Sequence, residues 1–175
     1  MDRQLFLEVV KDSYSAYYSI VPEEETGHPG LPLAFRADYH SRDEQYFFVK
    51  SANIWGNEKN EFAYVFSAPT FDPELADRCL TWALEDMLPR VKPHKEHQNT
   101  NCKVVLIADR LPEETVEVVR KRKFSKNYGT LGIQGYTELL TAAVDLNREK
   151  TYTNRMGSAL TSFFSKLFAL RREEA

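Results

Sequence analysis

The 175-residue sequence has few cysteines and no long apolar run, and both absences exclude classes of protein. Its two cysteines, Cys79 and Cys102, form no Cys-x-x-Cys pair, so no zinc or thioredoxin-like motif is present. No stretch approaches the roughly 18 apolar residues that a membrane-spanning helix requires. The N-terminus lacks the charged-then-apolar layout of a signal peptide. The sequence therefore predicts a soluble, cytoplasmic protein with buried free thiols and no membrane partner.

A strong positive charge is also missing. The formal net charge is −3, which argues against a surface that is basic throughout, although a local basic patch remains compatible with it. The content of 42% hydrophobic and 13% aromatic residues is typical of a globular protein rather than a disordered one. The chain length suits one domain, and no repeat or linker divides it. We therefore expect a single domain over residues 1–175.

Hydrophobic periodicity predicts the helices. Apolar residues recur at three- and four-residue spacing in three segments, which are Arg3–Ile20, Pro73–Leu88 and Met156–Leu170. A shorter helix is expected to begin near Pro112. Asp72 precedes Pro73 and can cap the free amides of the second helix.

Strand-like runs occupy most of the remaining sequence. Leu33–Asp38, Gln45–Asn53 and Glu61–Ala68 are joined by connections too short for a crossover, which predicts an antiparallel meander. Lys103–Ala108 is almost uninterruptedly apolar, as is typical of a central strand covered on both faces. Tyr136–Leu146 resumes strand character. The predicted fold class is α/β (mixed α+β), with about five strands in a mixed sheet flanked by helices and the element order αβββαβαβα.

The order αβββαβ, which covers most of residues 1–108, resembles the core of the restriction-endonuclease-like proteins. That family places one acid near the end of a hairpin strand and an acid-x-Lys motif on the next strand. Together these groups hold a divalent metal ion and activate water for phosphodiester hydrolysis. The resemblance implies that Asp38 is the first acid and Glu61 the second, with Mg²⁺ as the cofactor of this alternative.

The family motif is not intact in this sequence. Two positions after Glu61 stands Ala63, where the family has lysine. A lysine supplied by another element would leave no linear motif, so this question stays open. The favoured interpretation is that Asp38 and Glu61 are exposed polar residues at strand edges, because a fold does not imply a function.

The densest positive cluster follows the short third helix. It consists of Arg120, Lys121, Arg122, Lys123 and Lys126. Phe124 and Tyr128 interleave with it, an arrangement that could combine base stacking with phosphate contacts. The favoured interpretation is that these cations stabilise the C-terminal end of the helix dipole, since the chain is negative overall.

Histidines and glycines give no motif of known chemistry. His94 and His97 follow a helix-ending proline in a polar segment and lack the His-Glu-x-x-His spacing of zinc proteases. Gly129, Gly132 and Gly135 lack the following helix of a dinucleotide site, so they are expected to shape a loop. The sequence therefore predicts neither a metal ion nor a cofactor.

These observations favour a non-enzymatic cytoplasmic domain that self-associates. The last predicted helix carries Phe163, Phe164 and Phe168, which is more apolar surface than a narrow stripe needs, so a homodimer through this helix is a candidate partner arrangement. The alternative is a divergent or degenerate metal-dependent nuclease-like protein that binds nucleic acid.

Overall fold

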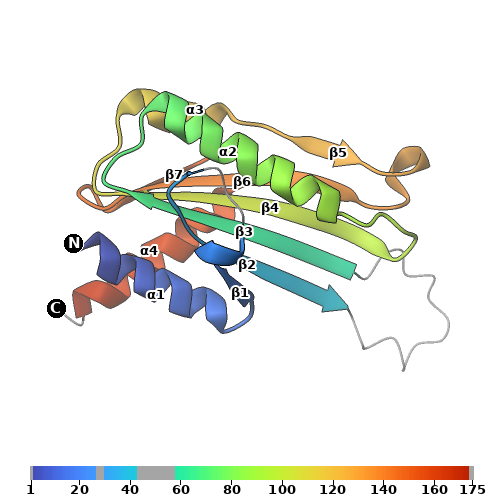
Figure 1. Cartoon of the computed structure of the whole chain (residues 1–175), viewed down its shortest axis with the longest axis horizontal. Helices are drawn as coiled ribbons and strands as arrows, with labels where there is room; N and C mark the ends of the chain where they lie inside the picture. Colours follow the sequence, from blue (N-terminus) through green and yellow to red (C-terminus); the bar gives the residue numbers. More distant parts are fainter. Residues whose placement is uncertain (1, 27–29, 43–57, 174–175) are drawn as a thin grey trace.

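The computed structural model describes residues 2–26, 30–42 and 58–173, and this part of the chain forms one mixed sheet of seven strands (Figure 1). The strands are β1 (Ser19–Pro22), β2 (Leu33–Arg42), β3 (Glu58–Ala68), β4 (His97–Ala108), β5 (Ser125–Asn127), β6 (Tyr136–Asp145) and β7 (Lys150–Thr153). The helices are α1 (Arg3–Ser15), α2 (Pro73–Met87), α3 (Glu113–Lys121) and α4 (Ser158–Glu173). Short 3₁₀ helices are η1 (Glu23–Glu25), η3 (Leu88–Arg90) and η4 (Thr130–Gly132).

The sheet combines an antiparallel half with a parallel half. Its order is β1-β2-β3-β4-β6-β5, and β7 also pairs with β6. Strand β2 runs antiparallel to both neighbours, whereas β3, β4 and β6 are parallel. Parallel neighbours require crossover connections, and α2 and α3 supply them. The predicted fold class is confirmed, although the sheet has more strands than the five expected from the sequence.

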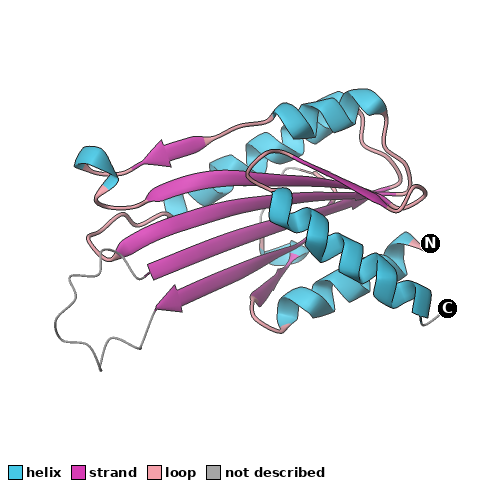
Figure 2. Cartoon of the chain, turned by 180° about the vertical axis from the view of Figure 1, so that it is seen from behind, coloured by secondary structure: helices cyan, strands magenta, loops and turns pink. Residues whose placement is uncertain are grey.

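Two helices cover each face of the sheet (Figures 1 and 2). Residues that alternate along β3 point to opposite sides, so Phe62 and Tyr64 pack with α2 and α3, while Ala63 and Val65 pack with α1 and α4. We call the first side the α2 face and the second the α1 face. The start of α1 and the end of α4 lie at the same end of the molecule (Figure 1).

Strand β4 is the buried centre of the sheet, as its apolar run predicts. It lies between β3 and β6, and Val104–Ala108 are fully buried. The strand begins six residues earlier than predicted, and two of the polar side chains at its start pair with each other. His97 Nε2 lies 2.9 Å from Thr100 Oγ1, and both side chains are buried.

The first helix is shorter than the sequence predicts. It ends at Ser15, and Ile20 instead lies in β1, where it pairs with Ala37 of β2. The antiparallel meander thus contains β1, which the sequence analysis did not predict. The strand predicted over Gln45–Asn53 lies outside the described residues. Among the described helices, none is long and apolar enough to cross a membrane.

The apolar stripe of α4 belongs to the core of the chain. Phe164 is fully buried, and its ring centroid lies 6.4 Å from that of Phe6 in α1. Leu160, Leu167 and Phe168 are also buried on the α1 face. The face that the sequence offered as a homodimer surface is therefore already covered by the sheet and by α1.

Candidate functional site

The two predicted acids, Asp38 and Glu61, lie on opposite faces of the sheet. Asp38 is opposite Phe62 in the register of β2 and β3, and Phe62 belongs to the α2 face. Glu61 is the preceding residue of β3 and therefore points to the α1 face. The two carboxylates cannot share one metal ion, so the structure contradicts the prediction that Asp38 and Glu61 form one site. Each acid instead lines a separate hollow.

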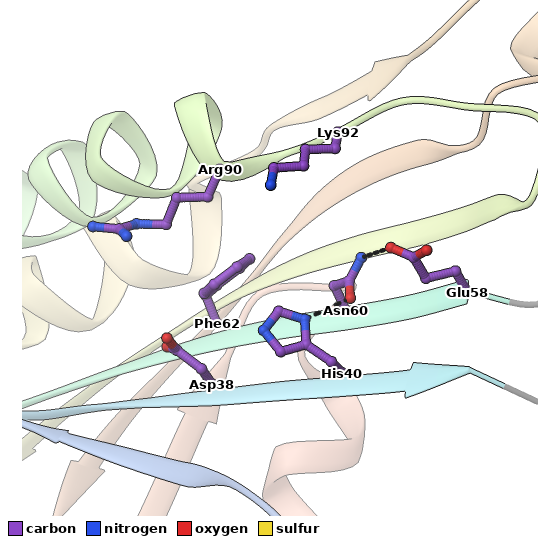
Figure 3. Close-up of a pocket in the computed structure, with 7 residues that line it drawn as sticks. All are labelled: Asp38, His40, Glu58, Asn60, Phe62, Arg90 and Lys92. Atoms are coloured by element: carbon purple, nitrogen blue, oxygen red, sulfur yellow. Dashed lines mark hydrogen bonds between the residues drawn. The ribbon is translucent and has the colours of Figure 1, made fainter.

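The hollow on the α2 face, which we call the polar cleft, has a volume of about 410 Å³ (Figure 3). Its lining residues are Asp38, His40, Glu58, Asn60, Phe62, Arg90 and Lys92. Strands β2 and β3 form one wall, and the segment that follows α2 carries the two basic side chains opposite it (Figure 3).

Asp38 forms an ion pair with Arg36, and Arg36 also approaches Asp86 of α2. Arg36 donates to its two carboxylate oxygens over 2.8 and 2.9 Å, and Arg36 Nη1 lies 3.6 Å from Asp86 Oδ2. Asp86 also accepts a hydrogen bond of 2.7 Å from the Tyr64 hydroxyl. Burial, together with this hydrogen bond, raises the pKa of Tyr64 above its ordinary value. The phenol therefore remains a neutral donor to Asp86.

Glu58 begins a second polar network in the polar cleft. Its Oε1 accepts from Asn60 Nδ2 over 3.0 Å, and its Oε2 lies 3.0 Å from His94 Nε2. The Asn60 hydrogen bond, with help from His94, lowers the pKa of the Glu58 carboxyl. His40 Nδ1 lies 2.7 Å from Asn60 Oδ1. Since the Asn60 amide nitrogen donates to Glu58, its oxygen accepts a hydrogen bond from the Nδ1–H of His40, which leaves His40 Nε2 available to the cleft.

The two cations of the polar cleft differ in their contacts. Arg90 Nη2 donates to Asp86 Oδ1 over 3.1 Å, and Arg90 Nε donates to the Asp86 backbone carbonyl over 3.1 Å. Lys92 is exposed and forms no ion pair with any residue that the structure describes. The cleft thus presents one anchored and one free positive charge.

The hollow on the α1 face, which we call the tyrosine cleft, has a volume of about 530 Å³. It lies between α1, α4 and the sheet, and its lining residues are Ser13, Tyr14, Tyr17, Tyr18, Glu61, Asn101, Lys103, Leu140, Ala159, Leu160 and Phe163. Most of this lining is aromatic or aliphatic. Charged groups enter only at the floor, from strands β3 and β4.

A triad of polar side chains forms this floor. Lys103 Nζ lies 2.5 Å from Glu61 Oε2 and 3.1 Å from the Tyr18 hydroxyl, and that hydroxyl donates to Glu61. Burial and the contact with Glu61 raise the pKa of Tyr18 above its ordinary value. A lysine from another element therefore does stand beside Glu61, but Asp38 lies across the sheet, so the two-acid site of a nuclease is not formed.

The predicted basic cluster is largely engaged within the chain. Arg122 donates to Asp77 over 2.8 Å and to Thr81 over 2.9 Å. Lys121 and Arg120 lie 2.8 and 3.8 Å from Glu117, and both occupy the last turn of α3, where cations favour the helix dipole. The two remaining members, Lys123 and Lys126, are exposed, and Lys126 lies over the Tyr128 ring. Three of the five cations therefore pair with acidic side chains of the chain itself.

The two neighbouring histidines, His94 and His97, make different contacts. His94 lies in a loop, as predicted, whereas His97 lies in β4 and uses both ring nitrogens, with Nδ1 lying 2.7 Å from the Gln134 carbonyl. A Cβ atom at Gly135 would approach His97 Nδ1 to 2.4 Å, so this close packing requires glycine. Within the described ranges, no three His, Cys, Asp or Glu side chains are placed to hold a metal ion.

Most residues of both clefts were not predicted from the sequence. Lys103 opens an apolar strand, and Tyr18 continues the helical spacing of α1 although it lies beyond the helix. His40 and Glu58 are isolated in sequence and meet through Asn60. One sequence pattern could have grouped the residues of the polar cleft, namely the two-residue period of side chains along a strand. By this period, positions 38 and 40 share a face of β2, and positions 58, 60 and 62 share a face of β3. The pairing register, which the sequence does not specify, brings the two sets together.

Comparison with known proteins gives one match. No curated protein and no solved structure matches the chain. Residues 2–166 match the family described as "Domain of unknown function (DUF8052)". Because this match spans most of the sequence, the chain belongs to the DUF8052 family.

Proposed function

We propose that this chain is a non-enzymatic binding domain that holds a neutral aromatic small molecule, bearing a hydroxyl or amide group, in the tyrosine cleft. The observation that carries this proposal is an apolar hollow of about 530 Å³ with a polar triad on its floor. Ligand sites are typically concave and mostly apolar, with a few convergent polar groups and volumes of about 300–1,000 Å³.

The walls of the tyrosine cleft suit an aromatic ring. Tyr14 and Phe163 meet edge to face with centroids 5.6 Å apart, and Leu140 and Leu160 add aliphatic surface. Tyr17 stands at the rim with 80% of its surface exposed. An aromatic ligand would bury this surface and gain edge-to-face contacts with the rings already present.

The floor of the cleft favours a neutral polar head group. Lys103 and Glu61 neutralise each other, so a charged head would meet a like charge from one of them. Lys103 retains one N–H beyond its bonds to Glu61 and Tyr18, and Glu61 retains Oε1. A hydroxyl or amide can accept from the first and donate to the second.

A neighbouring hollow extends the same surface. It shares Tyr17, Tyr18 and Glu61 with the tyrosine cleft and adds Tyr39, Lys59 and Asn99. Asn99 Oδ1 is buried and accepts no hydrogen bond from the described residues. A buried acceptor without a donor is costly, but this oxygen has almost no accessible surface and is not counted as a ligand contact. The shared residues make the two hollows parts of one surface on the α1 face.

The proposal predicts selective binding of matched benzene derivatives. Saturation-transfer NMR would compare phenol and benzamide with toluene, which lacks the polar head, and with benzoate, which is charged. We expect phenol and benzamide to bind at least about tenfold more tightly than the other two, since one hydrogen bond to a charged group contributes about 1.5–3 kcal/mol.

Two variants locate the site. Tyr17→Ala removes exposed rim surface and should weaken phenol binding severalfold without unfolding the chain. Lys103→Met removes the head-group donor, whereas Lys166→Met on the exposed side of α4 serves as its control. Absence of saturation transfer to every probe, or equal binding by wild type and Tyr17→Ala, would overturn the proposal.

We further propose a restriction-endonuclease-like architecture and a cytoplasmic location. The observed order α1-β1-β2-β3-α2-β4 again reads αβββαβ, with β1 as one of its three strands in place of the predicted run Gln45–Asn53, and this order supports the first. Cys79 and Cys102 are free, buried thiols, as expected in a reducing compartment, which supports the second. Neither proposal includes nuclease activity through Asp38 and Glu61, because these acids point to opposite faces.

A further inference from the structure

The polar cleft on the α2 face carries charges of both signs on facing walls. Glu58 and Asp38 belong to the strand wall, and Arg90 and Lys92 project from the opposite side (Figure 3). The strand wall thus carries two acidic side chains, and the opposite wall carries two basic side chains. In the tyrosine cleft, by contrast, the two charged lining residues, Glu61 and Lys103, pair with each other.

The acidic wall is held in place before any ligand arrives. Arg36 fixes Asp38 through two hydrogen bonds, and Asn60 and His94 each contact one oxygen of Glu58. The contacts that lower the pKa of Glu58 keep it ionised at neutral pH. A carboxylate has about four acceptor positions, so Glu58 can still accept from a ligand. The strand wall therefore offers a fixed negative charge with spare capacity.

The basic wall offers a free positive charge. Arg90 is anchored to Asp86, whereas Lys92 is exposed and without an ion-pair partner among the described residues. Lys92 lines the cleft, and its side chain extends toward the space above Phe62 in Figure 3. Its ammonium can therefore meet a ligand anion without first breaking a contact within the chain.

We infer that the polar cleft binds a small zwitterion, with a protonated amine against Glu58 and an anionic group against Lys92. Since Arg36 pairs with Asp38 and Asp86 pairs with Arg90, the repulsion of a simple anion comes mainly from Glu58, and that of a simple cation comes mainly from Lys92. A dipolar molecule satisfies both walls and leaves neither charge unpaired. The volume of about 410 Å³ accommodates a molecule of amino-acid size.

His40 adds a group that can recognise the middle of such a ligand. Its Nδ1–H donates to Asn60, and its Nε2 has no partner in the described part of the chain. The ring also meets Phe62 edge to face at a centroid distance of 5.8 Å, which fixes its plane. An N–H or hydroxyl between the two charged ends of the ligand could donate to Nε2.

The test compares three molecules of similar size that differ in charge. Heteronuclear NMR titrations would use 4-aminobutyrate, butyrate and butylamine, with inorganic phosphate as a fourth probe. We expect 4-aminobutyrate to shift backbone signals of β2 and β3 at the polar cleft and to bind at least about tenfold more tightly than the other probes. Equal or tighter binding of butyrate, butylamine or phosphate would overturn the inference, as would no binding of 4-aminobutyrate.

Single variants test which residue of the cleft binds each end of the ligand. Lys92→Gln should weaken 4-aminobutyrate binding about tenfold and leave the fold intact, because the side chain is exposed. Lys95→Gln, an exposed neighbour outside the cleft, is the control and should leave binding unchanged. Glu58→Gln keeps the side-chain shape and should weaken binding similarly. Unchanged affinity in both Lys92→Gln and Glu58→Gln would contradict the assignment.

Discussion

At the scale of single residues, the buried side chain of Asn154 joins three elements. Its Nδ2 donates to the carbonyl oxygens of Arg122 and Leu139 over 3.0 and 2.8 Å. Its Oδ1 accepts from the backbone N–H groups of Thr141 and Gly157 over 3.1 and 2.8 Å. The amide thereby connects the end of α3, strand β6 and the approach to α4. The contacts of Asn154 with β6 depend on the tertiary fold, so the sequence alone does not predict them.

We expect Asn154→Ala to be strongly destabilising. The change leaves several buried backbone groups without partners, at a cost of about 1–3 kcal/mol for each. A total of about 3 kcal/mol would lower the Tm by about 6–12 °C in a chain of this length. Urea denaturation and a thermal melt would measure the effect. Asn147→Ala, in an exposed turn, is the control, and a similar small loss in both variants would show that the Asn154 network is not important for stability.

At the scale of elements, substitutions in α4 test whether this helix packs in the core of the chain or mediates self-association. Phe164 is buried against Phe6 and Phe163, so Phe164→Ala should destabilise the chain by about 3–5 kcal/mol through the cavity it leaves. Leu170→Ala, on the exposed side of the same helix, should change stability by less than about 0.5 kcal/mol. Urea denaturation would compare the two variants. A sedimentation experiment that shows a wild-type dimer, and a folded Phe164→Ala monomer, would contradict this assignment.

The same scale shows why some elements follow from the sequence and others do not. Helix α2 was predicted within one residue because Asp72, Pro73 and a continuous apolar stripe all mark it locally. Helix α1 lacks a local stop signal, since Tyr17 and Tyr18 continue its apolar spacing, and its end depends on the pairing of β1 with β2. Strand β5 is short and polar, so nothing in its sequence distinguishes it from a loop.

At the scale of the whole molecule, the clefts arise from a sheet that separates two apolar cores. The order of elements, the central strand and the helical layers follow from hydrophobic periodicity, which the sequence displays directly. The clefts follow from register and from which helix ends beside which strand, and neither is a local property. This is why Asp38 and Glu61 were identified individually as polar positions on strands but were assigned to one site.

If the chain unfolds as one cooperative unit, the thiols of Cys79 and Cys102 should be protected from alkylation to the same extent. Cys79 in α2 and Cys102 in β4 are fully buried, and burial raises the pKa of the Cys79 thiol to about 12 and also raises that of Cys102. Since the thiolate is the reactive form, both should be alkylated only when the chain opens.

Iodoacetamide labelling followed by peptide mass spectrometry would compare the two cysteines in one sample. We expect equal rates, slower by about a thousandfold or more than at an exposed cysteine introduced by Ser165→Cys, because only the small unfolded fraction reacts. Addition of urea should accelerate the labelling of Cys79 and Cys102 together. Faster labelling of Cys79 alone would mean that α2 leaves the sheet independently, and the polar cleft, whose basic wall follows α2, would then open with it.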